Sequence, residues 1–132
     1  MKCVYCSAKK TTIPNSRSTK LQTQTWRRHY CTQCKRTFTT FEKPDMKHLA
    51  IDTDGALNPY SRGKLYLSIA RSFQTKQPDY KLLDTIVDTI EIKLLKLSTP
   101  TLTNHIVAEI TLTTLKPLNK RAYLHYLADH TN

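Results

Sequence analysis

The chain has 132 residues, with 21 Lys and Arg against 10 Asp and Glu, which gives a formal net charge of +11 at pH 7. Its length allows one ordinary domain or two small units. No apolar run is long enough to span a bilayer, and the first 20 residues lack the apolar core of a secretory signal, so we expect a cytoplasmic protein with no membrane partner.

All four cysteines fall into two pairs of the same spacing, Cys3-x-x-Cys6 and Cys31-x-x-Cys34. Two such pairs supply four thiolates, which close a tetrahedron around one zinc ion and leave no position open for water. The predicted site is therefore structural and not catalytic. Two disulfides are the first alternative, and they would require an exported protein. Redox use of one pair is the second, and neither pair has a strand-helix-strand pattern around it.

Positive charge is concentrated in the first third of the chain. Residues 1–48 hold eleven Lys and Arg against Glu42 and Asp45, a net of +9, whereas residues 49–132 hold ten against eight, a net of +2. This shift predicts two units, residues 1–44 and residues 45–132. A basic metal-binding unit favours a polyanion as its partner. The alternative is that the basic surface serves only solubility.

The first unit is predicted to be a zinc ribbon. Residues 16–20 are polar and form a loop or an edge strand. Residues 22–30 and 35–42 combine threonines with aromatic side chains, a composition typical of strands, and each segment adjoins a cysteine of the second pair. So few apolar side chains are present that the unit would need its metal in order to fold.

The second unit is predicted to contain a β-hairpin followed by four helices, and the fold class is therefore α+β. An apolar strand at 46–51 leads to Asp54-Gly55, a hairpin signal, and Pro59 places the returning strand at an edge. Ser61 is the expected N-cap of the first helix. The apolar spacing and the capping residues predict helices at 62–75, from Asp79 to 97, at 104–115 and from Asn119 to 129.

Several motifs resemble the NrdR family, the bacterial repressors of ribonucleotide reductase genes. They are the Met-Lys-Cys-x-x-Cys start, Asn15-Ser16-Arg17, Arg27-Arg28-His29 before the third cysteine, and the string RTFTTFE that begins at Arg36. The likeness extends over essentially the whole chain. It implies a zinc ribbon followed by an ATP-cone, which is a small sheet with four helices. In the second unit it rests on Asp54-Gly55, Pro59-Tyr60, Lys64-Leu65 and Ala122-Tyr123.

The resemblance implies double-stranded operator DNA as the partner, homo-oligomers as the active form, and a cytoplasmic, nucleoid-associated location. Arginine can read guanine or bind phosphate, and lysine can bind the backbone. We expect the DNA contacts to come from Arg17, Arg27, Arg28, Arg36 and Lys35. His29 is placed where it could reach a phosphate. No nucleophile is paired with a base and no glycine-rich phosphate loop occurs, so we do not expect an enzyme.

An ATP-cone implies that ATP or dATP binds the second unit, and the residues that match this role are Gly55, Ser61 and Lys64. Where ATP-cones usually carry Lys-Arg before Asp-Gly, this chain has Asp52-Thr53. A carboxylate there repels phosphates, whereas Lys64 near a helix N-terminus attracts them. Two interpretations follow: a nucleotide site that modulates oligomerisation, or a unit that serves only as an oligomerisation scaffold.

Two other function classes remain open from the sequence. The ribbon could belong to an adaptor that binds RNA, a polymerase or a ribosome component without reading DNA sequence. The chain could also be an accessory subunit that senses nucleotides and acts directly on an enzyme. Asp84, Asp88 and Glu91 share one face of the second helix and are predicted to form an ordinary solvated surface.

Overall fold

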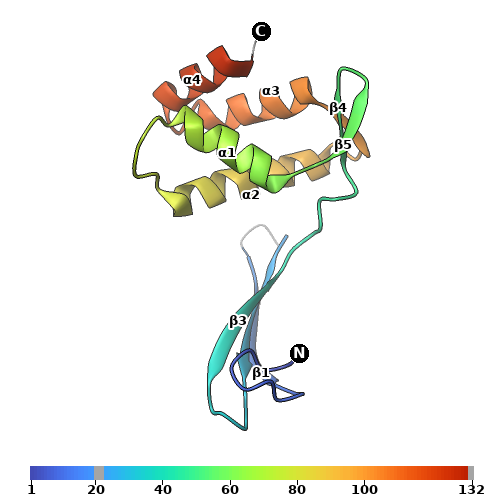
Figure 1. Ribbon diagram of the computed structural model, residues 1–132, viewed down its shortest axis with the longest axis vertical. Helices are drawn as coiled ribbons and strands as arrows, with labels where there is room; N and C mark the ends of the chain where they lie inside the picture. The colour runs from blue at the N-terminus through green and yellow to red at the C-terminus, as the bar shows by residue number, and fades with distance from the viewer. Residues whose placement is uncertain (20–22, 131–132) are drawn as a thin grey trace. The chain divides into compact units, whose positions relative to one another are not determined.

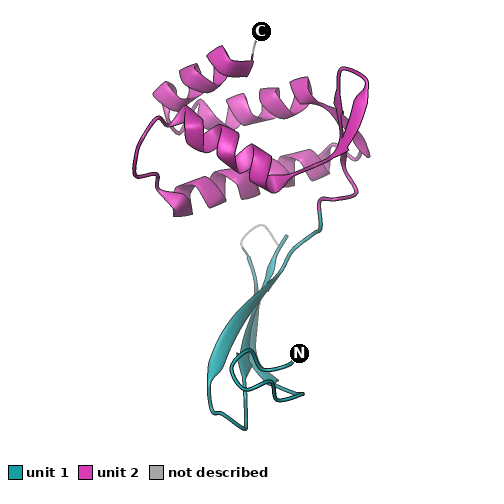
Figure 2. Ribbon diagram, in the orientation of Figure 1, with its two compact units in different colours: residues 1–45 teal, residues 46–132 magenta. Residues whose placement is uncertain are grey.

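The computed structural model describes residues 1–19 and 23–130, and Figure 2 shows its two compact units, Met1–Asp45 and Met46–Asn132. Lys20 and Gln22, which belong to the predicted loop and the predicted strand of the ribbon, lie outside the described residues. The first unit is built from strands, and the second combines a small sheet with four helices (Figure 1). The α+β class is confirmed.

The first unit is a three-stranded antiparallel sheet. Its strands are β1 (Thr12–Ser18), β2 (Thr25–Tyr30) and β3 (Thr37–Glu42), in the order β1-β2-β3. Threonine and aromatic residues dominate β2 and β3, as expected for side chains that fit a pleated surface. β1 is exposed along its whole length, which suits an edge strand.

The second unit begins with a hairpin of β4 (Ala50–Thr53) and β5 (Ala56–Pro59). Asp54 and Gly55 both have positive φ, at 52° and 89°, which is the backbone that a two-residue hairpin turn of the I′ type requires. Oδ1 of Asp52 accepts a hydrogen bond of 2.8 Å from the Gly55 N–H and holds this turn closed. The predicted hairpin is confirmed, with β5 and its proline at the sheet edge.

Two features of this sheet differ from the prediction. A third strand, β6 (Thr101–Thr103), pairs in parallel with β4, so that the order is β5-β4-β6. Its three residues are too few for a periodic signal, and its partner lies about 50 residues earlier in the sequence. Residues 46–49 form a turn rather than a strand, in which the Leu49 N–H donates to the Met46 carbonyl oxygen. Their apolar side chains are buried nonetheless, which explains the strand-like composition.

Four helices complete the unit: α1 (Arg62–Ser72), α2 (Tyr80–Lys96), α3 (Asn104–Leu115) and α4 (Lys120–His130). Each begins where a side-chain oxygen accepts a hydrogen bond from a backbone N–H of the first turn, which satisfies a donor that has no partner inside the helix. The capping residues are Ser61, Asp79, Thr103 and Asn119. Within the described ranges no helix is both long and apolar enough to cross a membrane.

The core of the second unit is organised around α2. Its inward stripe consists of Leu83, Ile86, Val87, Ile90 and Leu94, all essentially buried. The other elements add fully buried side chains to the same cluster, among them Ile69, Leu102 and Leu115. α3 contributes two buried threonines, which its composition did not mark as core. Thr111 and Thr114 donate their hydroxyls to carbonyl oxygens one turn earlier, and the Thr114 hydroxyl also accepts a hydrogen bond from Lys93 at 2.8 Å.

Arg62, at the start of α1, forms ion pairs with three carboxylates of α2. These carboxylates were predicted to form a solvated face. Its guanidinium lies 3.2 Å from Asp84, 2.8 Å from Asp88 and 3.1 Å from Glu91. The Tyr60 hydroxyl donates to Glu91 at 3.0 Å. Burial and the nearby Glu91 charge raise the pKa of Tyr60, which keeps it a donor. The prediction holds for Asp84, whose side chain is 61% exposed, but was wrong for Glu91, because a partner from another helix turns this face into an ion-pair network.

We expect Leu94→Ala to destabilise the second unit by about 2–5 kcal/mol, because Leu94 is completely buried and its truncation leaves a cavity. Leu82→Ala is the matched control, since Leu82 lies in the same helix and is 38% exposed. We expect it to cost less than about 1 kcal/mol. Urea unfolding followed by helical circular dichroism measures both. Equal losses would contradict the core assignment.

Candidate metal centre and nucleic-acid interface

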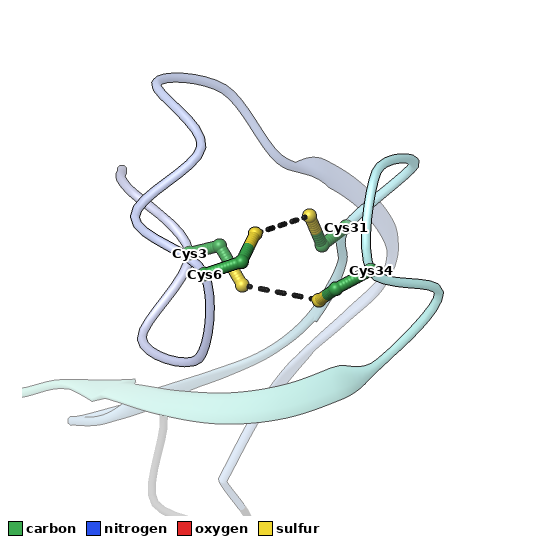
Figure 3. A group of neighbouring side chains, drawn as sticks. All are labelled: Cys3, Cys6, Cys31 and Cys34. Atoms are coloured by element: carbon green, nitrogen blue, oxygen red, sulfur yellow. Dashed lines mark hydrogen bonds between the residues drawn. The ribbon is translucent and has the colours of Figure 1, made fainter.

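The four cysteine sulfurs converge on one point between two loops (Figure 3). Sγ of Cys3 lies 3.6 Å from that of Cys34, and Sγ of Cys6 lies 3.6 Å from that of Cys31. All four sulfurs lie within 4.8 Å of one another. Cys3 and Cys31 are buried beneath the turns, and Cys6 is exposed. Each of these two short sulfur–sulfur distances joins a cysteine of the first pair to a cysteine of the second. This is the arrangement expected when both pairs bind one ion.

The two cysteine loops have the same backbone geometry. In the first, the Ser7 N–H donates to the Cys3 carbonyl oxygen at 3.0 Å, and in the second the Lys35 N–H donates to Cys31 at 2.9 Å. Ser7 and Lys35, each directly after the second cysteine of its pair, adopt positive φ of 62° and 60°. These left-handed residues turn the chain directly after each cysteine pair.

Backbone donors favour the ionised thiol at two of the positions. The pKa of Cys31 is lowered to about 6, foremost by the backbone N–H of Cys34, which outweighs the opposing effect of burial. Burial raises the pKa of Cys3, but backbone N–H groups of Cys6 and Tyr5 outweigh it, and the pKa is lowered. Both effects prepare thiolates for a metal.

Cys34 shows why a cation is needed. The Arg36 backbone N–H lowers its pKa, but burial and the three neighbouring thiols raise it, to about 11. Four thiolates at this spacing repel one another, so the protein alone does not keep all of them ionised. A divalent ion between them removes that repulsion.

The donor set and its spacing fit zinc. A tetrahedron with Zn–S bonds of about 2.3 Å places its sulfurs about 3.8 Å apart, which agrees with the observed separations of 3.6 Å. A disulfide would bring two sulfurs to about 2.05 Å, and all four cysteines are free. The chain holds one structural zinc ion, coordinated by Cys3, Cys6, Cys31 and Cys34.

A small group of side chains packs beside the metal site. Ala8 and the two buried cysteines form its core, and Phe38 lies against them. His29 is 4% exposed, and its ring stacks on Phe38 with centroids 4.8 Å apart. Its two ring nitrogens lie 3.2 Å from the Thr11 hydroxyl and 2.8 Å from the Thr40 hydroxyl. His29 therefore belongs to the ribbon core, and the expectation that it could reach a phosphate was wrong.

The five cations predicted to contact DNA lie at three places on the ribbon. Arg17 lies on β1, Arg27 and Arg28 are neighbours on β2, and Lys35 and Arg36 follow the last cysteine. The Arg36 guanidinium lies over the Tyr5 ring, 5.1 Å from its centroid. Arg27 forms an ion pair with Glu42 at 3.1 Å. The other residues of this set carry no carboxylate partner among the described side chains.

The second unit contains a cavity of about 1080 Å³. It brings together the three residues predicted for nucleotide, because Gly55 in the hairpin turn, Ser61 at the N-cap of α1 and Lys64 in its first turn all line it. Residues of β6, α3 and α4 complete the wall, and no sequence pattern pointed to them. They include Asn104, His105, Glu109 and His130. The carboxylates of Asp52, Asp54 and Glu109 also line it, so Lys64 is outnumbered.

The fold and the metal site define a zinc-ribbon protein with a second, α+β unit. Residues 1–42 match the family described as "Transcriptional repressor NrdR-like, N-terminal domain". Three relatives are similar over nearly the whole chain. The Transcriptional repressor NrdR of Albidiferax ferrireducens is 32% identical over 127 residues, covering 96% of this chain and 85% of its own. That of Syntrophotalea carbinolica is 32% identical, with coverages of 96% and 81%. Transcriptional repressor NrdR 3 of Paramagnetospirillum magneticum is 28% identical, with coverages of 100% and 87%.

The chain belongs to the NrdR family of transcriptional repressors. The resemblance stated from the sequence is thereby confirmed, and so is the zinc ribbon. The relatives are named as repressors and not as enzymes, and their names favour a regulator over an adaptor for RNA, a polymerase or the ribosome.

We expect Cys31→Ser to remove the zinc ion, because three thiolates no longer complete the tetrahedral site, and to unfold the ribbon, because the unit depends on bound metal to fold. Zinc content by atomic absorption and the fluorescence of Trp26, the chain's one tryptophan, measure this. Thr32→Ala, at an exposed position of the same loop, is the control and should keep one zinc per chain. A Cys31→Ser protein with full zinc content and unchanged fluorescence would contradict the tetrathiolate assignment.

Proposed function

We propose that the chain represses transcription by docking its zinc ribbon on double-stranded operator DNA upstream of ribonucleotide reductase genes, in the nucleoid of a bacterial cytoplasm. The observation that carries this is the charge of the ribbon in a chain of the NrdR family. Residues 1–45 hold ten Lys and Arg against Glu42 and Asp45, a net of +8. Such a surface attracts DNA by releasing counterions from its phosphates.

Homo-oligomers would provide the affinity that one ribbon lacks. A single small module buries little surface on DNA, and joining several modules turns each further contact into an intramolecular one. The second unit is the expected site of self-association. Exposed leucines on three of its elements support this, namely Leu57 at 63%, Leu67 at 55% and Leu124 at 51% exposed. Apolar side chains of this kind gain free energy when a second copy covers them.

The cavity of the second unit is a candidate site for ATP or dATP, and the convergence of Gly55, Ser61 and Lys64 on it favours this role. Lys64 and the N-terminus of α1 would receive the phosphates. Asp52 acts against them, although one of its oxygens is engaged with the Gly55 N–H. A nucleotide that binds here would change repression only if it favoured one oligomer over another.

Selection from a random pool of DNA duplexes tests the repressor function. We expect one sequence class to be enriched and to bind at least about 1,000-fold more tightly than random duplex at the same salt. We also expect binding to weaken steeply with salt, and zinc-depleted protein is the control. Equal affinity for the selected duplex, random duplex and structured RNA would favour the adaptor alternative and overturn the proposal.

Calorimetric titration with ATP and dATP tests the cavity. We expect Lys64→Ala to abolish binding, because it removes the lysine that lines the cavity in the first turn of α1. Asp52→Asn keeps an amide oxygen for the Gly55 N–H but removes the charge, and should tighten binding about fivefold, roughly 1 kcal/mol.

Absence of binding heat in both the parent chain and Asp52→Asn would refute the nucleotide site. The oligomerisation scaffold would then stand as the role of the second unit. Sedimentation of the parent chain, with and without nucleotide, separates a bound but silent ligand from one that changes the oligomer.

A further inference from the structure

The two faces of the ribbon sheet carry different chemistry, and the strand register assigns each side chain to one of them. In β2, successive side chains point to opposite faces, and directly paired residues on neighbouring strands share a face. Trp26 pairs with Arg17 on β1 and with Phe41 on β3, and Arg28 pairs with Asn15 and Thr39. These side chains and Tyr30 form what we call the aromatic face. Arg27 pairs with Ser16 and Thr40 on the other side, which we call the packed face.

The polar and charged side chains of the packed face find their partners within the ribbon. His29 is buried there against Phe38, beside the metal core. The Arg27 guanidinium donates to Glu42 at 3.1 Å and to the Ser16 hydroxyl at 3.4 Å. Arg27 and Glu42 are the charged residues that the register places on this face, and they neutralise each other.

The aromatic face is open and positive. Phe41 is 63% exposed, Trp26 is half-buried, and Arg17 and Arg28 are exposed. Arg28 donates one hydrogen bond, of 3.4 Å, to the Thr37 hydroxyl on the same face. The described register places no carboxylate on this side of the sheet. An exposed phenylalanine beside Trp26, on a face that also carries two arginines, is costly for a surface that meets only water, but it suits a surface that is covered by a polyanion with apolar rings and sugars.

Resting on the proposed function, we propose that the aromatic face is the surface that docks on duplex DNA, and that Arg28 and Arg17 contact DNA whereas Arg27 holds Glu42 within the ribbon. Arg17 and Arg28 are diagonal neighbours across two strands, about 7–8 Å apart at their backbones. That spacing lets them reach different phosphates of one strand, which follow each other every ~3.4 Å along the axis. Trp26 and Phe41 then pack against the sugars or bases between them.

Arg27→Ala and Arg28→Ala form a matched pair, because they remove the same side chain from adjacent positions of one strand and differ in the face that they alter. The full-length, zinc-loaded protein is titrated against its selected duplex by fluorescence anisotropy at several salt concentrations. We expect Arg28→Ala to weaken binding at least tenfold and to reduce the salt slope by about one. We expect Arg27→Ala to stay within about threefold of the parent chain, because it leaves only an exposed Glu42 without its partner.

Phe41→Ala is a second test of the aromatic face, and it leaves the charge of that face unchanged. We expect it to weaken binding several-fold with little change in the salt slope, because stacking and packing are lost but no phosphate contact is. Zinc content and far-ultraviolet circular dichroism confirm that each variant is folded. Sedimentation without DNA tests the competing occupant, a second copy of the chain.

The outcomes separate this inference from the proposed function. If the parent chain binds no duplex, the proposed function itself fails. If the parent binds but Arg27→Ala loses as much affinity as Arg28→Ala, the assignment of the aromatic face is overturned. It is also overturned if Phe41→Ala reduces the oligomer mass and leaves DNA binding unchanged, since the face would then be an interface between copies.

Discussion

The ribbon depends on the mutual repulsion of four thiolates and on the zinc ion that reverses it. Among the residues that the structure describes, Ala8 and the half-buried Phe38 are those that add apolar packing around the sulfurs. That core is too small to hold a unit of about 45 residues together by the hydrophobic effect. The free energy of zinc binding is therefore the free energy of folding for this unit. The surface side chains of this unit are therefore not needed to form a core, and they can carry charge.

The second unit is stabilised in the ordinary way, by a continuous apolar core around α2. It also contains a network of ion pairs that joins Arg62 to three carboxylates of α2. Arg62 lies between Ser61 and Lys64 in the sequence, and both of these line the cavity. The cavity rim is thus fixed to α2 by ion pairs in addition to packing, and a ligand would meet a wall that is already ordered.

The sequence was informative wherever the signal was local. Cysteine spacing predicted the metal site, Asp54-Gly55 predicted the turn, and Ser61 and Asn119 predicted helix starts, because each depends on residues within a few positions. Long-range partners were not predictable. β6 is defined by its pairing with β4, and the role of Asp88 is defined by an arginine 26 residues away. The same holds for the DNA candidates, since alternation shows that Arg27 and Arg28 face opposite ways, but only the strand partners show which way is open.

The position of the metal next to β2 has a consequence for recognition. Cys31 follows Tyr30, the last residue of this strand, so a sulfur bound to zinc fixes where the strand ends. A slip of β2 by one residue along its neighbours would exchange the two faces, exposing His29 and turning Arg27 outward. Such a slip would also pull Cys31 off the ion. Zinc coordination thus determines which side chains of β2 lie on each face of the sheet. It therefore also determines which of the two adjacent arginines lies on the open face.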